Sequence, residues 1–331
     1  MPANIEMQRL DGSLSGRRPA LPAGISSRVR PRVSERGLKQ SPFEHRALPY
    51  LLLAPQLTTL LFFFFIPAFR GLIQAFQLAD PFGGSTQWVG FDNLAALMRS
   101  APYWASVRIT VVFTIALSVV TLGVALIFAF AAHHVLRGQS VYKTVLLIPY
   151  AIAPAISGIV WAFLFNPAVG PIAHLIHSVG LPWDPNRYPG HAMTLVVLAS
   201  AWKQISYNFL FLIAGLLAVP KSVLEAAAVD GAGPVRRFIS IALPMLTPTL
   251  FFLVVVNFVY GFFETFAVVD ATTKGGPAGA TTTLVYKVYL DGFVSLDLGA
   301  SAAQSIILMA LALMLTVVQF RFVEQRVKYS V

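Results

Sequence analysis

Six long apolar stretches separated by polar segments dominate the sequence. Each holds about 20 mostly apolar residues, the length that an α-helix needs to cross the roughly 30 Å hydrocarbon core of a bilayer. The stretches cover residues 48–69, 107–132, 145–165, 193–219, 247–269 and 301–320. All are too long and too uniformly apolar to be amphipathic surface helices. The pattern therefore predicts an all-α polytopic membrane protein with six transmembrane helices.

The composition excludes a soluble globular domain. The chain has 331 residues, of which 56% are hydrophobic and 11% are charged, whereas soluble domains are about 45–50% apolar and about 25% charged. Cysteine is absent, which excludes a disulfide framework, cysteine-ligated zinc and an iron–sulfur cluster. In a membrane protein, the formal charge of +10 reports orientation rather than binding to nucleic acid.

The basic residues indicate how the chain is oriented. Most of the 24 lysines and arginines lie before the first span or after the second, fourth and sixth spans. By the positive-inside rule, these segments and both termini are cytoplasmic. Residues 1–46 are basic, rich in Ser, Pro and Gly, and without periodic apolar positions, so we expect a disordered cytoplasmic tail before a membrane domain at 47–331.

The cytoplasmic segment between the fourth and fifth spans, residues 220–246, has the most specific pattern. Ser222 followed three residues later by Glu225 fits a capping box, which predicts a short helix that starts just after the serine. Gly231 permits the left-handed turn that ends such a helix, and Pro234 suits the first turn of another. We expect a helix–turn–helix elbow beneath the membrane.

The same segment follows the spacing EAA-x3-G-x9-I-x-LP. The fixed positions, with the acidic residue before the glycine, are Glu225, Ala226, Ala227, Asp230, Gly231, Ile241, Leu243 and Pro244. This pattern resembles the EAA loop of permease subunits of bacterial binding-protein-dependent ABC importers. The resemblance implies a type I ABC importer transmembrane domain in the bacterial inner membrane, with the elbow as the helix that couples it to an ATPase subunit.

The resemblance also implies partners. The expected complex holds a second homologous permease subunit, two ATPase subunits that bind ATP and Mg, and an external solute-binding protein, all in or on membrane lipid. The chain itself is expected to bind no cofactor, metal or nucleic acid. It is not expected to be an enzyme, because it lacks a GxxxxGK[ST] phosphate-binding loop and a Ser/His/Asp set with a nucleophile motif.

Three further strings extend the resemblance and narrow the substrate. Residues 49–56 and 202–211 are similar to permeases of importers for sn-glycerol-3-phosphate, with glycerophosphodiesters as possible further ligands, whereas the Gly-Gly-Pro stretch within 271–284 is shared with sugar permeases of the maltose type. A permease for a sugar or oligosaccharide is therefore the alternative. A secondary transporter, the alternative of another class, needs coupling-ion sites that the sequence does not show.

Lys203 lies about ten residues into the fourth span. A charge at such a depth costs about 2.5–3.5 kcal/mol on insertion scales, so we expect it to face a cavity or a partner. An anionic phosphate in transit suits this lysine; the alternatives are an ion pair with Glu264, the one acidic residue in a predicted span, and snorkelling to the interface. Ser206 and Tyr207 share its helix face and Asn208 lies on the neighbouring one, which completes the candidate substrate path.

Two other features bear on the helices. Asn257, Tyr260 and Glu264 fall along one stripe of the fifth span, and we expect them to hydrogen-bond to neighbouring helices. Pro149 and Pro154 are predicted to kink the third span, because proline lacks the N–H that continues a helical ladder. The external segment 270–298 is expected to be either a platform for a docking protein or an aromatic belt at the interface.

Overall fold

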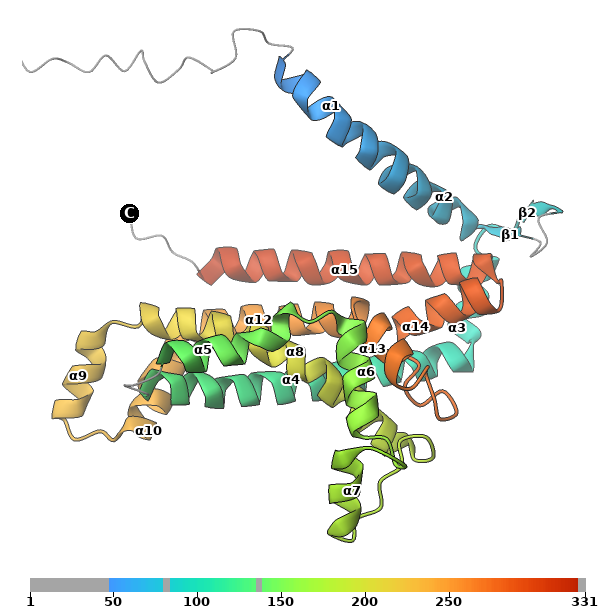
Figure 1. Cartoon of the computed structure of the whole chain (residues 1–331). Coiled ribbons are helices and arrows are strands. Elements are labelled where there is room, and N and C mark those ends of the chain that lie inside the picture. Colours follow the sequence, from blue (N-terminus) through green and yellow to red (C-terminus); the bar gives the residue numbers. More distant parts are fainter. Residues whose placement is uncertain (1–47, 80–83, 135–138, 327–331) are drawn as a thin grey trace, which may run out of the picture. The chain divides into compact units, whose positions relative to one another are not determined.

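The computed structural model describes residues 48–79, 84–134 and 139–326 (Figure 1). The expectation for the tail at 1–46 lies outside these residues. The chain divides into two compact units, residues 1–59 and 60–331. In the first unit the described residues form most of α1, and the other described elements belong to the second.

The described elements are almost all helical. In chain order they are α1 (Leu48–Leu60), η2 (Leu61–Phe65), α2 (Ile66–Gln74), β1 (Gln77–Ala79), β2 (Thr86–Trp88), α3 (Asp92–Arg99), α4 (Ala101–His134), α5 (Gln139–Leu147), η3 (Ile148–Ala151), α6 (Pro154–Leu164), α7 (Pro171–Ser178), α8 (Pro189–Ala218), α9 (Lys221–Val229), α10 (Pro234–Arg237), η4 (Phe238–Ala242), α11 (Leu243–Met245), α12 (Thr247–Phe263), α13 (Phe266–Thr272), α14 (Leu284–Tyr289), η5 (Leu290–Val294) and α15 (Leu298–Arg326). The segments η2, η4 and η5 are π-helical, and η3 is a 3₁₀ helix. The strands β1 and β2 pair antiparallel.

Four helical stretches are long and apolar enough to cross a membrane. They are Tyr50–Gln74, Ala101–Ala132, Pro189–Ala218 and Leu298–Arg321. Two further regions reach that length only if a bent pair of helices counts as one span, which gives up to six. The described residues therefore contain a helical segment at each of the six predicted positions, but two of the six are not straight helices.

The kink predicted in the third span, residues 145–165, is confirmed and divides the span into separate helices. The chain bends by 100° between α5 and α6. Pro149 lies within the 3₁₀ turn η3, and Pro154 is the first residue of α6. Proline has no backbone N–H, so Pro149 interrupts the helical hydrogen bonds. Pro154 is tolerated at the start of α6 because the first N–H groups of a helix have no partner within that helix.

The fifth predicted span, residues 247–269, is also interrupted. The helix α12 ends at Phe263, where Glu264 is the C-cap, and α13 follows. At its other end α12 meets the preceding helical segment at a bend of 70°. Glu264, which the sequence places within this span, is exposed at the end of α12.

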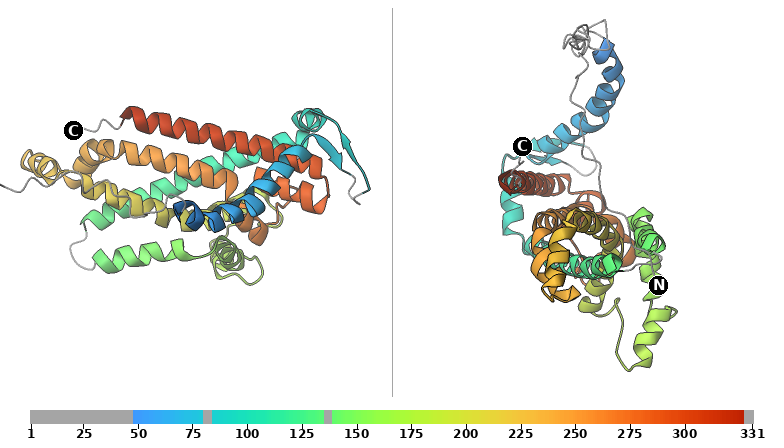
Figure 2. Two further views of the ribbon diagram at one scale, coloured as in Figure 1. Left: turned by 90° about the horizontal axis from the view of Figure 1, so that it is seen from above. Right: turned by 90° about the vertical axis from the view of Figure 1, so that its left-hand side faces the viewer.

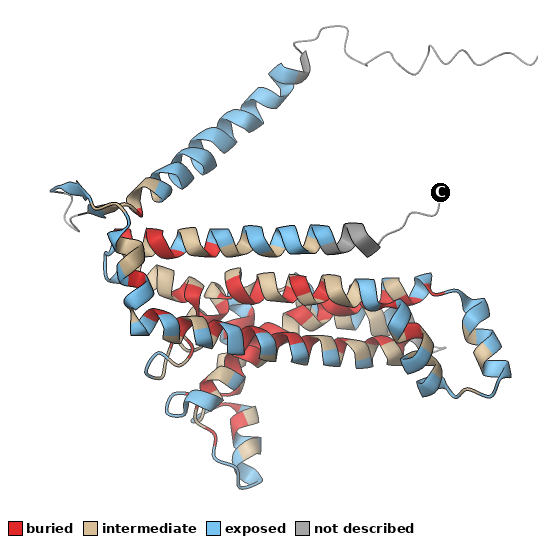
Figure 3. Ribbon diagram, turned by 180° about the vertical axis from the view of Figure 1, so that it is seen from behind, coloured by how far each residue is buried: buried red, intermediate tan, exposed pale blue. Residues whose placement is uncertain are grey.

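The helices α4, α8 and α12 pack side by side and form the core of the second unit (Figures 1 and 2). Small residues allow the backbones to approach closely, as is usual between membrane helices. A Cβ on Gly261 of α12 would lie 2.5 Å from the hydroxyl oxygen of Thr114 on α4, and one on Gly158 of α6 would lie 2.8 Å from Ala271 on α13. Buried residues gather in this bundle, whereas the residues of α9 are mostly exposed (Figure 3).

The elbow helices α9 and α10 lie at one end of the bundle, and α15 ends toward the same end (Figures 1 and 2). Lys221, Arg236, Arg237 and Arg321 are therefore gathered at that end. This is the distribution of positive charge from which the sequence predicts the cytoplasmic side.

Candidate functional site

The elbow begins where α8 ends. Val219 is the C-cap of α8, Pro220 is the N-cap of α9, and α10 starts with Pro234 in its first turn. The Nη1 atom of Arg237 donates to the backbone oxygen of Leu224 at 3.5 Å, which joins the two elbow helices. The predicted helix–turn–helix is therefore present in the described structure.

Gly231 ends α9 in the way that its position predicts. Its φ is +80°, in the left-handed region that costs a residue with a side chain about 1–2 kcal/mol. The N–H of Ala232 donates to the oxygen of Ala227 at 2.9 Å, and the N–H of Gly231 donates to the oxygen of Ala228 at 3.1 Å. These two bonds make a Schellman motif, which satisfies the last carbonyls of α9 and fixes the sharp turn.

The predicted capping box at the start of α9 is wrong. The helix begins at Lys221, so Ser222 already lies in its first turn. The cap is Pro220, and no side chain hydrogen-bonds to the cap. Because Ser222 comes after the cap, its hydroxyl cannot reach the third helical N–H as a capping residue would.

The elbow presents an exposed surface of mixed character. Glu225, Ala226, Asp230 and Gly231 are exposed, and the side chain of Val229 is 89% exposed. The helix α9 has nine residues, too few to cross a membrane. Exposed apolar and small residues beside carboxylates are typical of a surface that another protein covers. The remaining pattern residues Ile241, Leu243 and Pro244 lie farther on, where the chain enters the bend before α12.

Lys203 faces an aromatic group that the sequence did not indicate. Its Nζ lies 5.9 Å from the ring centre of Tyr150, a cation–π distance. The rings of Tyr150 and Tyr207 are 5.7 Å apart, and Tyr207 in turn lies 4.9 Å from Phe211. Tyr150 is 47% exposed, and Lys203 and Tyr207 are partly exposed. The break between α5 and α6 thus places a tyrosine over the one lysine of α8.

The ion pair between Lys203 and Glu264, one of the alternatives for this lysine, does not form. Within the described ranges the structure has a single ion pair, Lys287 with Asp291. Glu264 is instead the exposed C-cap of α12, and its N–H donates to the oxygen of Tyr260 at 2.9 Å. Lys203 therefore keeps an uncompensated positive charge beside its aromatic neighbours.

Ser206 and Asn208 do not share the exposed face of Lys203. Ser206 is 1% exposed and Asn208 is fully buried. The amide nitrogen of Asn208 donates to the side-chain oxygen of Asn257 at 3.1 Å, Asn257 returns a bond of 3.1 Å, and Gln204 adds a third bond to Asn257 at 3.3 Å. These amides join α8 to α12, so the expected interhelical hydrogen bonding is confirmed for Asn257, and Asn208 contacts a helix rather than an open path. It is not confirmed for Glu264, which is exposed at the end of α12.

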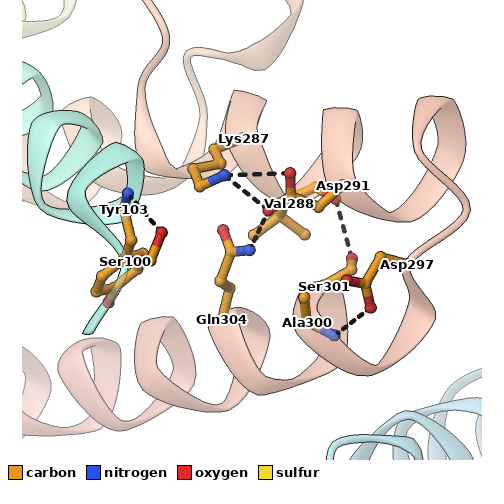
Figure 4. Close-up of polar contacts among 9 residues, drawn as sticks. All are labelled: Ser100, Tyr103, Lys287, Val288, Asp291, Asp297, Ala300, Ser301 and Gln304. Atoms are coloured by element: carbon orange, nitrogen blue, oxygen red, sulfur yellow. Dashed lines mark hydrogen bonds and ion pairs between the residues drawn. The ribbon is translucent and has the colours of Figure 1, made fainter. Parts of the chain in front are cut away.

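A second charged cluster lies on α14, η5 and α15 (Figure 4). Lys287 pairs with Asp291 at 2.9 Å, and the amide nitrogen of the buried Gln304 also donates to Asp291. The hydroxyl of Ser301 donates to the backbone oxygen of Val288 at 2.9 Å. These contacts connect segment 270–298 to α15. They also explain why Lys287 and Asp291, spaced i, i+4, carry opposite charges.

The external segment is also held by Tyr286. Its hydroxyl donates to Asp270 at 3.1 Å, and its ring packs against Phe266 and Tyr289. Burial, together with the hydrogen bond to Asp270 and the charge of that residue, raises the pKa of Tyr286 to about 12. The tyrosine is therefore a hydrogen-bond donor at neutral pH, and its contacts pack this segment against α13.

Sequence reasoning missed Tyr150 as a site residue. It lies 53 residues before Lys203, so helical spacing cannot pair the two. The two prolines around it were the available signal, because a discontinuous membrane helix often lines a binding site.

Comparison with known proteins gives consistent matches. The family model "Binding-protein-dependent transport system inner membrane component" matches residues 121–329. The sn-glycerol-3-phosphate transport system permease protein UgpA of Rhizobium meliloti (strain 1021) is 54% identical over 288 residues, which are 87% of this chain and 98% of that protein. UgpA of Escherichia coli (strain UTI89 / UPEC) is 52% identical over the same shares of both chains.

A solved structure shows the same fold. A chain of a bacterial ABC transporter involved in the import of the acidic polysaccharide alginate matches with a TM-score of 0.72 and 19% sequence identity. The match covers 85% of this chain and 96% of that one. The same kind of transporter in complex with a periplasmic protein bound to an alginate pentasaccharide matches with a TM-score of 0.70.

Proposed function

Because this chain belongs to the binding-protein-dependent transport system inner membrane components, we propose that it is the permease subunit of an ATP-driven importer that carries sn-glycerol-3-phosphate across the inner membrane. The assignment of the substrate rests on the sequence identity of 52–54% to sn-glycerol-3-phosphate permeases over 98% of their length. That length includes both the elbow and the segment around Lys203.

The chemistry of α8 supports a phosphate ester. Lys203 has no carboxylate partner among the described residues, and its Nζ lies over the ring of Tyr150. A positive charge that is partly exposed inside a span attracts a transient anion more strongly than it would in water, because the local dielectric constant is low. Tyr150 and Tyr207 add hydroxyls beside it. Glu264 lies at the end of α12, where the negative charge of its carboxylate would disfavour a phosphate ester that stays bound.

The mechanism that we propose is alternating access. A loaded external binding protein docks outside, and a second homologous permease completes the path. Two ATPase subunits bind ATP and Mg. When they close, they move the elbow segment 225–231, and this segment transmits the movement to α8 and to the bent segment before α12. The Schellman turn at Gly231 supports this role, because a turn fixed by two hydrogen bonds transmits force as a rigid body. Both termini are cytoplasmic in this scheme.

Uptake of labelled sn-glycerol-3-phosphate tests the proposal. We compare cells that carry the intact gene, a deletion of the gene, or the deletion complemented with the gene. Unlabelled maltose or a glycerophosphodiester is added as a competitor. We expect the deletion to abolish uptake, complementation to restore it and maltose to have no effect; competition by the diester would extend the substrate range. Unchanged uptake after deletion, combined with a loss of sugar transport, would refute the substrate and support the sugar permease instead.

A further inference from the structure

A cavity of about 360 Å³ lies inside the elbow. The last turn of α8, the helices α9 and α10, and η4 surround it, and seven of its ten lining residues are apolar. Leu216, Leu224 and Phe238 form much of this apolar lining, and the charged lining residues are Lys221, Glu225 and Arg237.

The two cations of the cavity lack carboxylate partners. Lys221 and Glu225 are spaced i, i+4 on α9, yet they form no ion pair, since Lys287–Asp291 is the single pair in the described part of the chain. Arg237 makes only the long bond of 3.5 Å to a backbone oxygen, and its Nε atom is buried without a hydrogen-bond partner. A buried donor without an acceptor is unfavourable, and the side chain that carries it lines the cavity, so an anion beside Arg237 would be stabilised.

The position of the cavity matches the boundary of the membrane. Leu216 and Leu217 belong to the last turn of a candidate span, Pro189–Ala218, whereas Lys221 and Arg237 lie on the elbow beyond it. If the membrane ends where this span ends, the apolar walls would face acyl chains and the positive charges would lie near the lipid phosphates. Basic pockets between membrane helices at this level suit the headgroups of anionic lipids.

We propose that this cavity binds one anionic phospholipid from the leaflet on the side of the elbow. Its acyl chain lies among Leu216, Leu224 and Phe238, and its phosphate lies between Lys221 and Arg237. A free phosphate or a small phosphate ester fits less well, because the apolar walls offer it no hydrogen bonds. A bound lipid would link α9 and α10 to the end of α8, so that lipid charge would influence coupling. The inference does not depend on which substrate the transporter carries.

Native mass spectrometry of the purified transporter complex tests the proposal. The complex is exchanged from nanodiscs that contain phosphatidylcholine with a minor fraction of phosphatidylglycerol, and the lipids that remain bound are counted. We expect retention of phosphatidylglycerol in the wild type and a loss of about tenfold or more in Lys221→Gln/Arg237→Gln, because each basic residue contributes to attraction of an anionic headgroup. Arg237→Lys retains the lipid.

Arg236→Gln is the matched control, because Arg236 is the exposed neighbour of Arg237 on α10 and does not line the cavity. It should change retention by less than about twofold. Leu217→Trp fills the cavity from an exposed position while it keeps both charges, so it should also reduce retention. Three results would overturn the proposal: equal retention of phosphatidylcholine, an equal loss in Arg236→Gln, or displacement of the lipid by inorganic phosphate alone.

Discussion

The elbow and the middle of α8 differ in how the sequence specifies them. At the elbow, each feature comes from residues close together in the chain: the N–H of Gly231 donates to Ala228, and Pro234 opens the next helix within a few residues. Around Lys203, the neighbours come from η3 and α12, far away in sequence. Local backbone chemistry fixes the part that we propose contacts an ATPase subunit, whereas tertiary packing fixes the part that we propose contacts the substrate.

The largest effect is expected at the turn of the elbow. Gly231 and Gly233 both have open space where a Cβ would project, but only Gly231 has a positive φ. Gly231→Ser should therefore strain the turn by about 1–2 kcal/mol and lower uptake of the phosphate ester by up to about thirtyfold. Gly233→Ser, at the N-cap of α10, should leave uptake unchanged. Equal losses in the two variants, at equal membrane levels, would refute a conformational role for Gly231.

The second largest effect is expected when the positive charge on α8 is removed. Lys203→Met removes the positive charge but keeps a side chain of similar length, and we expect uptake of sn-glycerol-3-phosphate to fall by about tenfold, as loss of about 1.4 kcal/mol of attraction would produce. Lys203→Arg should retain most uptake. Near-normal uptake by the methionine variant would show that the lysine makes no essential contact with the phosphate.

The buried amides should affect stability more than selectivity. Asn257→Leu leaves Asn208 and Gln204 without their shared partner, which costs about 1–3 kcal/mol. Thermal unfolding of the purified complex in detergent should show a lower midpoint, and the double variant Asn208→Leu/Asn257→Leu should recover part of the loss because both partners are then apolar. A double variant that is less stable than either single variant would contradict the pairing.

The smallest effect concerns Tyr150. Tyr150→Leu removes the ring beneath Lys203 and with it a cation–π contact of about 0.5–1 kcal/mol, so KM for uptake should rise by about two- to fivefold. Tyr150→Phe keeps the ring and should have a smaller effect. If the phenylalanine variant were the more impaired, the hydroxyl and not the ring would be the group that matters.

The sequence predicted the parts that depend on local pattern. Runs of apolar residues located the spans, and the glycine and proline positions of the elbow predicted its turn and its second helix. It did not predict the 100° bend between α5 and α6, because a proline indicates a break but not the direction in which packing turns the chain. The capping box failed for a related reason, since Pro220 starts the helix earlier than the serine would.

The residues of the predicted substrate path also differ in whether local sequence or packing determines their position. Lys203 and Tyr207 were recognised because a charge in an apolar stretch stands out, and helical spacing places the tyrosine beside it. The burial of Ser206 and Asn208 depends on where α12 and the other helices pack against α8, and no spacing along one helix contains that information.

ATP hydrolysis stimulated by the loaded binding protein, measured in proteoliposomes, tests most directly whether the elbow and the substrate path have separate roles. The transporter is reconstituted with its binding protein loaded with sn-glycerol-3-phosphate, and hydrolysis and transport are measured together for Lys203→Met and Gly231→Ser. We expect the lysine variant to transport poorly but to keep its stimulated hydrolysis, whereas the glycine variant loses both. Equal loss of stimulated hydrolysis in the two variants would contradict the account, because the elbow and the path would then not be separable.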